Sequence, residues 1–271
     1  MVHIVKKTFV GFWVGLYACS CFAQAPATRF HAPDYDCIAP DIFGQAALTV
    51  YLTDKAVAEA DTTVVTPQEE IQSALPLIRK LSKEGLLIAE PQNVYPEQWH
   101  ILQQSLKKFL NLPFAKRFPS YSLHLIQSGE INAFTAGSHI FFTEGLLQAA
   151  GTDKDVLSFI LFHEIGHNEL KHIYIKLKRK KELGEPLGAL GSLVFLSLNQ
   201  FNELEADCYA LDVMHMLAMD MHKGIEFFAV LEKSQAENNS RDHYFLDKLF
   251  STHPLNGERL DCLKEYLRNH F

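Results

Sequence analysis

The chain has 271 residues, of which 48% are hydrophobic, and 25 basic against 32 acidic side chains give a formal net charge of −7. This length suits one sizeable domain with its own core, and the apolar content excludes intrinsic disorder as the main state. An acidic chain is a poor binder of nucleic acid, so we expect no nucleic-acid partner. Five cysteines are too few for a small disulfide-stapled scaffold, whereas thirteen histidines justify a search for metal ligands.

Residues 1–23 have the composition of an export signal. Two lysines precede an apolar, uncharged run at residues 8–22, and small residues follow at Ala23 and Ala25. The apolar run is shorter than the ~20 residues that a membrane-spanning helix needs. We therefore expect a signal peptide at residues 1–23, cleaved after Ala23, and a mature protein in the periplasm.

A second interpretation of this segment is a lipoprotein signal. Residues 16–19 read Leu-Tyr-Ala-Cys, which is similar to a bacterial lipobox that ends at a lipidated cysteine, here Cys19. Tyr17 is bulky for its position in that motif. Both interpretations place the mature protein outside the cytoplasm, where disulfides are permitted.

The first half of the mature chain is predicted to be helical. Residues 24–65 form a mixed N-terminal extension that contains one helical stretch. A capping box of Thr66 and Glu69 opens the next helix, and Gly85 ends it. Another helix is predicted over residues 96–110 from the spacing of its apolar side chains.

Two strands are predicted in the middle of the chain. Residues 121–126 alternate between apolar and polar side chains, and residues 139–143 are rich in aromatic and β-branched types. The intervening residues 132–137 carry turn-forming types. We therefore expect two neighbouring strands joined by a loop, followed by a short helix from Glu144.

The second half of the chain is also predicted to be helical. Together with the two strands, these helices make the domain at residues 66–271 α+β, mostly helical with a small sheet. A helix capped by Thr152 or Asp153 is expected to continue into the basic stretch 171–181. Residues 184–198 are apolar and punctuated by glycines, which indicates a buried helix or a flap. Further helices are predicted over residues 201–219, 222–235 and 256–267.

A metal-binding pattern occurs within the helix that begins near residue 153. Residues 163–167 read His-Glu-Ile-Gly-His, and positions four apart lie on one helical face, so His163 and His167 can bind one ion together. Glu164 follows the first ligand and can take a proton from a water beside the ion. The apolar neighbours of this motif bury it, and buried imidazoles without a partner would be costly.

A third ligand is expected from the run Asn-Glu-Leu-Glu-Ala-Asp at residues 202–207. Glu203 and Asp207 share a helical face, so Glu203 can bind the ion while Asp207 accepts a hydrogen bond from the far nitrogen of a ligating histidine. Glu205 points elsewhere and is the weaker candidate. A solvated acidic helix face is the alternative explanation of the run.

The chain resembles the M48 metallopeptidases in four motifs that occur in consistent order within residues 121–267. The motifs are INAFTAGSHIFFTEGLL at 131–147, HEIGH at 163–167, ELEAD at 203–207 and STHPLNGERL at 251–260. Secreted bacterial members of this family are periplasmic enzymes, and some are lipoproteins.

The resemblance implies a mostly helical zincin-like (gluzincin) fold with a small sheet beside the HExxH helix. It also implies that one Zn²⁺ per chain is bound by His163, His167 and Glu203, with Glu164 as catalytic acid and base. His253 lies in a Thr-His-Pro turn that the family also shows.

The sequence leaves alternatives open for His253, His172 and the cysteines. His253 is expected either to act at the metal, by blocking the open position or stabilising an oxyanion, or to bond the backbone of its turn. His172 is expected on the helix surface or behind a ligand. Of the mature cysteines, we expect a Cys208–Cys262 pair near the site and a free Cys37, with three buried thiols as the alternative.

These patterns predict a zinc-dependent endopeptidase of the bacterial periplasm that hydrolyses peptide bonds of envelope or misfolded proteins. Its partners are expected to be protein or peptide substrates and outer-membrane or assembly-machinery proteins. The alternative is a periplasmic chaperone or assembly factor with gated or little proteolysis, which the apolar stretch 187–198 suggests. A metal-free structural domain is the third interpretation.

Overall fold

The computed structural model describes residues 30–60, 64–183, 188–228 and 257–271. The predicted export segment with Cys19 lies outside the described residues, and so does His253. Within the described part of the chain, no helix is long and apolar enough to cross a membrane.

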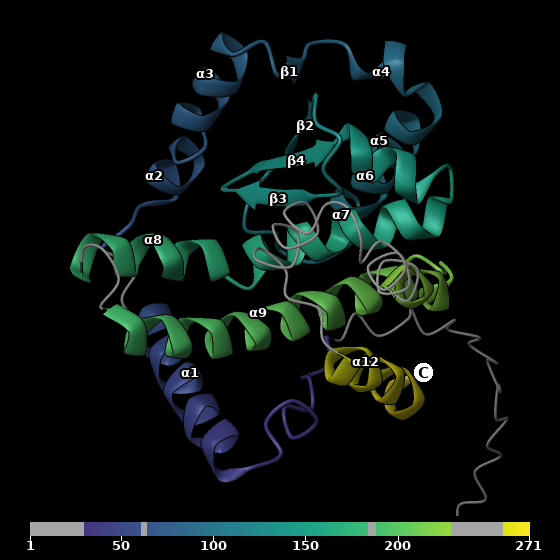
Figure 1. The fold of residues 1–271 in the computed structure, drawn as a ribbon. Helices are drawn as coiled ribbons and strands as arrows, with labels where there is room; N and C mark the ends of the chain where they lie inside the picture. The colour runs from purple at the N-terminus through teal and green to yellow at the C-terminus, as the bar shows by residue number, and fades with distance from the viewer. Residues whose placement is uncertain (1–29, 61–63, 184–187, 229–256) are drawn as a thin grey trace, which may run out of the picture.

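The elements follow one another from an N-terminal helix to a C-terminal helix (Figure 1). In chain order they are α1 (Ile42–Ala60), α2 (Pro67–Gln72), α3 (Leu75–Lys83), β1 (Leu87–Ile88), α4 (Pro91–Val94), α5 (Pro96–Leu110), β2 (Ser122–Ile126), β3 (Ala133–Ala136), β4 (His139–Thr143), α6 (Glu144–Ala150), α7 (Lys154–Glu169), α8 (His172–Leu183), α9 (Gly188–Met216) and α12 (Gly257–His270). Residues 221–228 are also helical. The predicted α+β class with a small sheet is confirmed.

The helix that was predicted from Thr66 to Gly85 is two helices, α2 and α3. Its predicted capping box is present, because the Glu69 backbone N–H donates to Thr66 Oγ1 at 3.2 Å and Glu69 accepts from the Thr66 backbone. Pro76 lies in the first turn of α3. A proline has no N–H and clashes with the carbonyl four residues earlier, so one continuous helix cannot pass through it.

The sheet has four strands in the order β1-β2-β4-β3. β2 runs parallel to β4, whereas β3 pairs antiparallel with β4, with Ala133 opposite Phe142 and Ala136 opposite His139. The prediction of a loop over residues 132–137 is therefore wrong. Only the residues around Gly137, which has a φ of +55°, make the turn of this hairpin.

The structure also breaks the helix that was predicted to run from residue 153 into the basic stretch. α7 ends at Glu169, and Lys171 has a φ of +63°, which turns the chain before α8 begins at His172. Since a helix cannot continue through a left-handed residue, α8 takes a new direction. His172 is thereby buried beside α7.

α7 is the central helix of the molecule. In Figure 1 it lies between the sheet and α9, and α1 and α12 pack on the other side of α9. Every residue of α7 from Asp155 to Asn168 is buried. A Cβ at Gly166 would lie 3.1 Å from the Ala206 carbonyl oxygen, so this glycine lets α7 and α9 approach closely.

The N-terminal extension packs against α9 and is tied to α12. Tyr51 of α1 and Phe201 of α9 form a buried cluster, and a disulfide joins Cys37 to Cys262. The predicted Cys208–Cys262 pair is therefore wrong, and Cys208 is a buried free thiol. The pairing depends on how the extension folds back over α9, which sequence spacing does not encode.

Candidate metal centre

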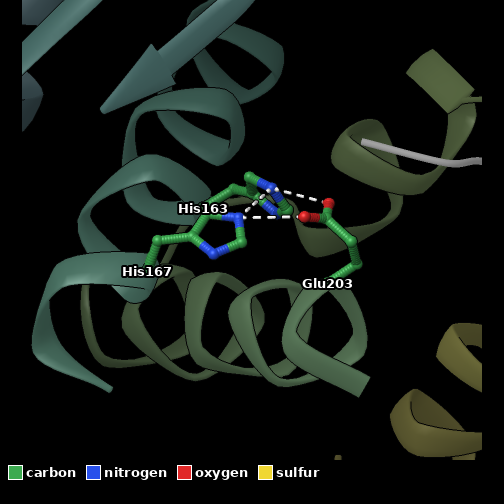
Figure 2. A group of neighbouring side chains, drawn as sticks. All are labelled: His163, His167 and Glu203. Carbon is green, nitrogen blue, oxygen red and sulfur yellow. Dashed lines mark hydrogen bonds and ion pairs between the residues drawn. The ribbon is translucent and has the colours of Figure 1, made fainter. Parts of the chain in front are cut away.

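Three buried side chains from two helices meet between α7 and α9. Figure 2 shows His163 and His167 on α7 facing Glu203 on α9. The two Nε2 atoms are 3.1 Å apart, and each lies 3.3 Å from a different carboxylate oxygen of Glu203. The structure thus brings together the three residues that the sequence predicted as ligands, and they form a group able to hold a metal ion.

The donor chemistry of this group fits a divalent metal ion. His163 Nδ1 donates to Asp207 Oδ1 at 2.7 Å, as expected for Asp207, so the neutral form of the ring has its lone pair on Nε2, which faces Glu203. Two imidazole nitrogens and one carboxylate make up a ligand set that catalytic zinc sites use, with a fourth position for water or substrate. The residues therefore fit zinc.

Burial and the neighbouring carboxylates have opposite effects on the pKa values of the two histidines. Burial opposes the charged form of His163, but the carboxylates of Asp207 and Glu203 outweigh it and raise its pKa to about 10. Burial lowers the pKa of His167 to about 3, despite the carboxylate of Glu203. The Asp207 and Glu203 carboxylates thus favour positive charge at His163, whereas the His167 ring stays neutral near pH 7.

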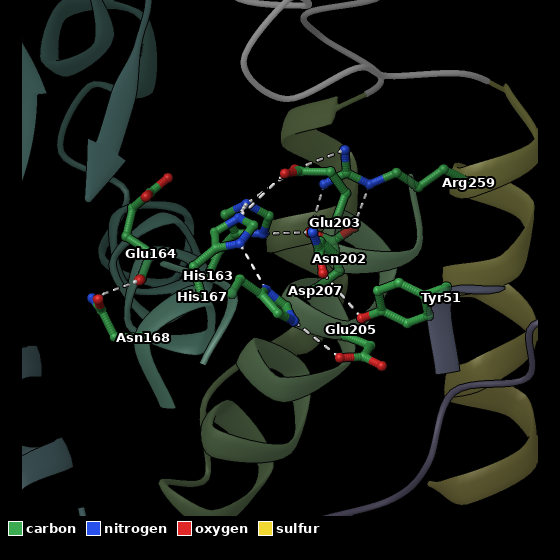
Figure 3. Close-up of polar contacts among 11 residues, drawn as sticks. Tyr51, His163, Glu164, His167, Asn168, Asn202, Glu203, Glu205, Asp207 and Arg259 are labelled. Atoms are coloured by element: carbon green, nitrogen blue, oxygen red, sulfur yellow. Dashed lines mark hydrogen bonds and ion pairs between the residues drawn. The ribbon is translucent and has the colours of Figure 1, made fainter. Parts of the chain in front are cut away.

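Arg259 of α12 completes the carboxylate side of the centre (Figure 3). Its Nε and Nη2 donate to Asp207 at 2.6 and 2.9 Å, and its Nη1 lies 3.2 Å from Glu203 Oε2. Burial would raise the pKa of Asp207, but Arg259 and His163 hold it below its ordinary value. Sequence reasoning missed Arg259, although it lies in the motif STHPLNGERL, because only tertiary packing places α12 beside α9.

Glu164 lies on α7 next to the first histidine. Its side chain is buried, and Figure 3 shows it on the other side of the two histidines from Arg259. Asn168 donates to the Glu164 carbonyl at 3.3 Å and to Thr135 Oγ1 of β3 at 2.6 Å, which ties this part of α7 to the sheet. The catalytic role of Glu164 stays a prediction.

His172 and Glu205 lie behind the second histidine. His172 is buried rather than on the surface, with its Nδ1 2.9 Å from His167 Nδ1 and its Nε2 3.0 Å from Glu205 Oε2. Burial lowers the pKa of His172, so its ring is neutral near pH 7. Glu205 does not belong to the three-residue donor group, in keeping with its weaker candidacy.

Comparison with known proteins places the site in a family. The family model of peptidase family M48 matches residues 97–184 and 180–267, which include the donor residues and Arg259. The mitochondrial metalloendopeptidase OMA1 of Bos taurus is 27% identical over 170 residues, which cover 53% of this chain and 32% of the relative. The chain thus corresponds to about a third of the length of this curated relative. Because the family match extends over more than half of the sequence, the chain belongs to peptidase family M48.

Proposed function

We propose that this protein is a zinc-dependent endopeptidase that hydrolyses peptide bonds of envelope or misfolded proteins in the bacterial periplasm. The observation that carries the proposal is the buried convergence of His163, His167 and Glu203 in a member of peptidase family M48. The Bos taurus relative is itself named a metalloendopeptidase. The expected partners are protein or peptide substrates and outer-membrane or assembly-machinery proteins, and no nucleic acid.

The chemistry divides between the ion and the side chains around it. Zn²⁺ held by the three ligands would polarise the substrate carbonyl and acidify a water molecule. The Glu164 carboxylate accepts the proton of the attacking water and passes it to the departing amine nitrogen, so that the peptide bond breaks with no net change in Glu164. Asp207 holds the His163 ring in place, and Arg259 balances the buried carboxylates.

Two features of the chain support the proposed location. The disulfide between Cys37 and Cys262 supports an oxidising compartment, because cytosolic thiols are kept reduced. The apolar segment at residues 8–22 supports export. Mass spectrometry of the mature protein distinguishes the two export signals, since cleavage after Ala23 leaves an unmodified N-terminus, whereas a lipoprotein begins at a lipidated Cys19.

Digestion of fluorescently labelled casein tests the activity. The metal-loaded chain should release labelled peptides, a chelator should stop release, and added Zn²⁺ should restore it. Glu164→Gln should bind zinc but lose at least 100-fold in turnover, because general acid–base catalysis typically contributes about 10²–10⁴-fold. Glu182→Gln, on the exposed face of α8, is the matched control and should keep full activity.

Two results would contradict this function. Proteolysis that survives complete metal removal would show that another site carries the activity. Stoichiometric zinc without hydrolysis of any protein substrate, together with full rescue of a deletion strain's envelope defect by Glu164→Gln, would favour the chaperone or assembly factor instead.

A further inference from the structure

A line of buried polar side chains leads from the metal centre to residues 30–60, which we call the N-terminal segment. It runs from His167 on α7 through His172, at the start of α8, to Glu205 on α9, with distances of 2.9 and 3.0 Å between the bonded atoms. Tyr35 and Lys55 of the N-terminal segment then both donate to Glu205. The proposed catalytic chemistry uses none of the last four residues.

We propose that His172 and Glu205 are positioning residues that fix the tautomer and orientation of the ligand His167, and that Lys55 and Tyr35 hold Glu205 for this task. The proposal rests on the proposed metal site, and it adds residues from outside the part of the chain that the family model matches, which begins at residue 97. The N-terminal segment is then part of the metal centre's support.

The direction of the hydrogen bonds determines the tautomer. An ionised Glu205 carboxylate can only accept, so His172 Nε2 must donate to it. A neutral imidazole that donates from Nε2 has its lone pair on Nδ1, and this lone pair can only accept from His167 Nδ1. His167 is thereby left with a lone pair on Nε2, the atom that faces His163 and Glu203.

The two ligand histidines are therefore supported in different ways. His163 bonds a carboxylate directly, that of Asp207, which Arg259 of α12 holds in turn. His167 reaches a carboxylate only through a second imidazole. In Figure 3, Arg259 lies near the top of the group of side chains and Glu205 near the bottom. Arg259 belongs to the C-terminal helix, and Lys55, which bonds Glu205, belongs to the N-terminal segment.

The backbone makes this arrangement possible. Because Lys171 adopts a left-handed conformation, with φ +63°, His172 turns back beside His167 instead of continuing along α7. Both His172 and Glu205 are only 5% exposed, so their hydrogen bonds are shielded from competing water. A buried carboxylate needs charged or polar partners, and Lys55 and Tyr35 supply them from the N-terminal segment.

Zinc affinity of the full mature chain, measured by competition with a chromophoric chelator, tests the proposal. His172→Leu removes the acceptor for His167 and should weaken zinc binding about 10–100-fold, the usual effect of losing a hydrogen-bond partner of a ligand. His172→Gln should bind zinc nearly as tightly as the unsubstituted chain, because its amide both donates and accepts. Lys55→Met should weaken binding by less than His172→Leu.

The matched control is His31→Leu. His31 also bonds a buried carboxylate of α9, that of Asp212 at 2.8 Å, but it does not contact the metal centre. This variant should lose stability and keep its zinc affinity. Equal zinc affinity in folded His172→Leu, or equal weakening in His31→Leu, would overturn the positioning role.

The imidazole ¹⁵N spectrum of the metal-free chain provides a second readout, which does not depend on proteolysis. His167 should carry its proton on Nδ1 in the unsubstituted chain and in His172→Gln, and should lose this preference in His172→Leu. A His167 protonated on Nε2 in the unsubstituted chain would refute the proposal by itself. Absence of zinc binding by the unsubstituted chain would instead contradict the proposed function, and the ¹⁵N spectrum would still test the hydrogen-bond relay.

Discussion

Reduction of the Cys37–Cys262 disulfide should destabilise the folded chain by several kcal/mol. The two cysteines are 225 positions apart in the sequence. The loop-closure expression for a loop of that length gives about 5 kcal/mol, and native disulfides commonly contribute about 2–4 kcal/mol. The expected loss in unfolding free energy is therefore about 2–5 kcal/mol, since the bond constrains nearly the whole unfolded chain.

The same bond lies close to the metal centre. Cys262 follows Arg259 by three positions on α12, and Cys37 belongs to the segment that carries Lys55. Reduction removes the covalent link between α12, which carries Arg259, and the segment that carries Lys55. The two parts of the chain that support the site are then no longer held together. We therefore expect zinc affinity to fall together with stability when the disulfide is reduced.

Urea unfolding of the chain, followed by tryptophan fluorescence with and without a thiol reductant, measures this effect. The midpoint of the unsubstituted chain should fall on reduction, and the double variant Cys37→Ala/Cys262→Ala should start low and ignore the reductant. Cys208→Ala is the control, because its thiol is buried and free, so its midpoint should still respond. An unchanged midpoint of the unsubstituted chain after complete reduction would show that the disulfide does not stabilise the fold.

Two further predictions concern charge. Arg259→Met leaves the carboxylates of Asp207 and Glu203 buried without their guanidinium partner, so unfolding free energy should fall by about 3–5 kcal/mol; a loss under about 1 kcal/mol in urea titrations would contradict this. Burial, and secondarily His139, lowers the pKa of His124 from 6.5 to about 4, so below pH 6.5 the unfolded chain binds the proton more readily. Stability should therefore fall between about pH 6.5 and pH 4, and His124→Phe should flatten this slope in thermal melts; an identical slope in the variant would exclude His124 as the cause.

The parts of the site that depend on one helix could be predicted from the sequence. His163 and His167 are four positions apart, and so are Glu203 and Asp207, and helical geometry alone puts each pair on one face. The apolar residues around the motif indicated a buried helix, and α7 is buried along almost its whole length.

The parts that depend on distant segments could not be predicted. Arg259 reaches the centre only because α12 packs on α9, and Cys37 meets Cys262 only because the extension folds back over the same helix. A left-handed Lys171 carries no sequence signal, since lysine rarely adopts this conformation. Because one continuous helix was predicted through Lys171, the burial of His172 beside α7 could not be predicted.

The metal coordination can be measured most directly by X-ray absorption at the zinc edge on the zinc-loaded chain. We expect one zinc per chain, two imidazole rings from His163 and His167, and only nitrogen or oxygen neighbours at ~2.0–2.2 Å, one of them from Glu203. Sulfur at ~2.3 Å, or zinc neighbours without imidazole scattering, would show that these three side chains do not hold the metal.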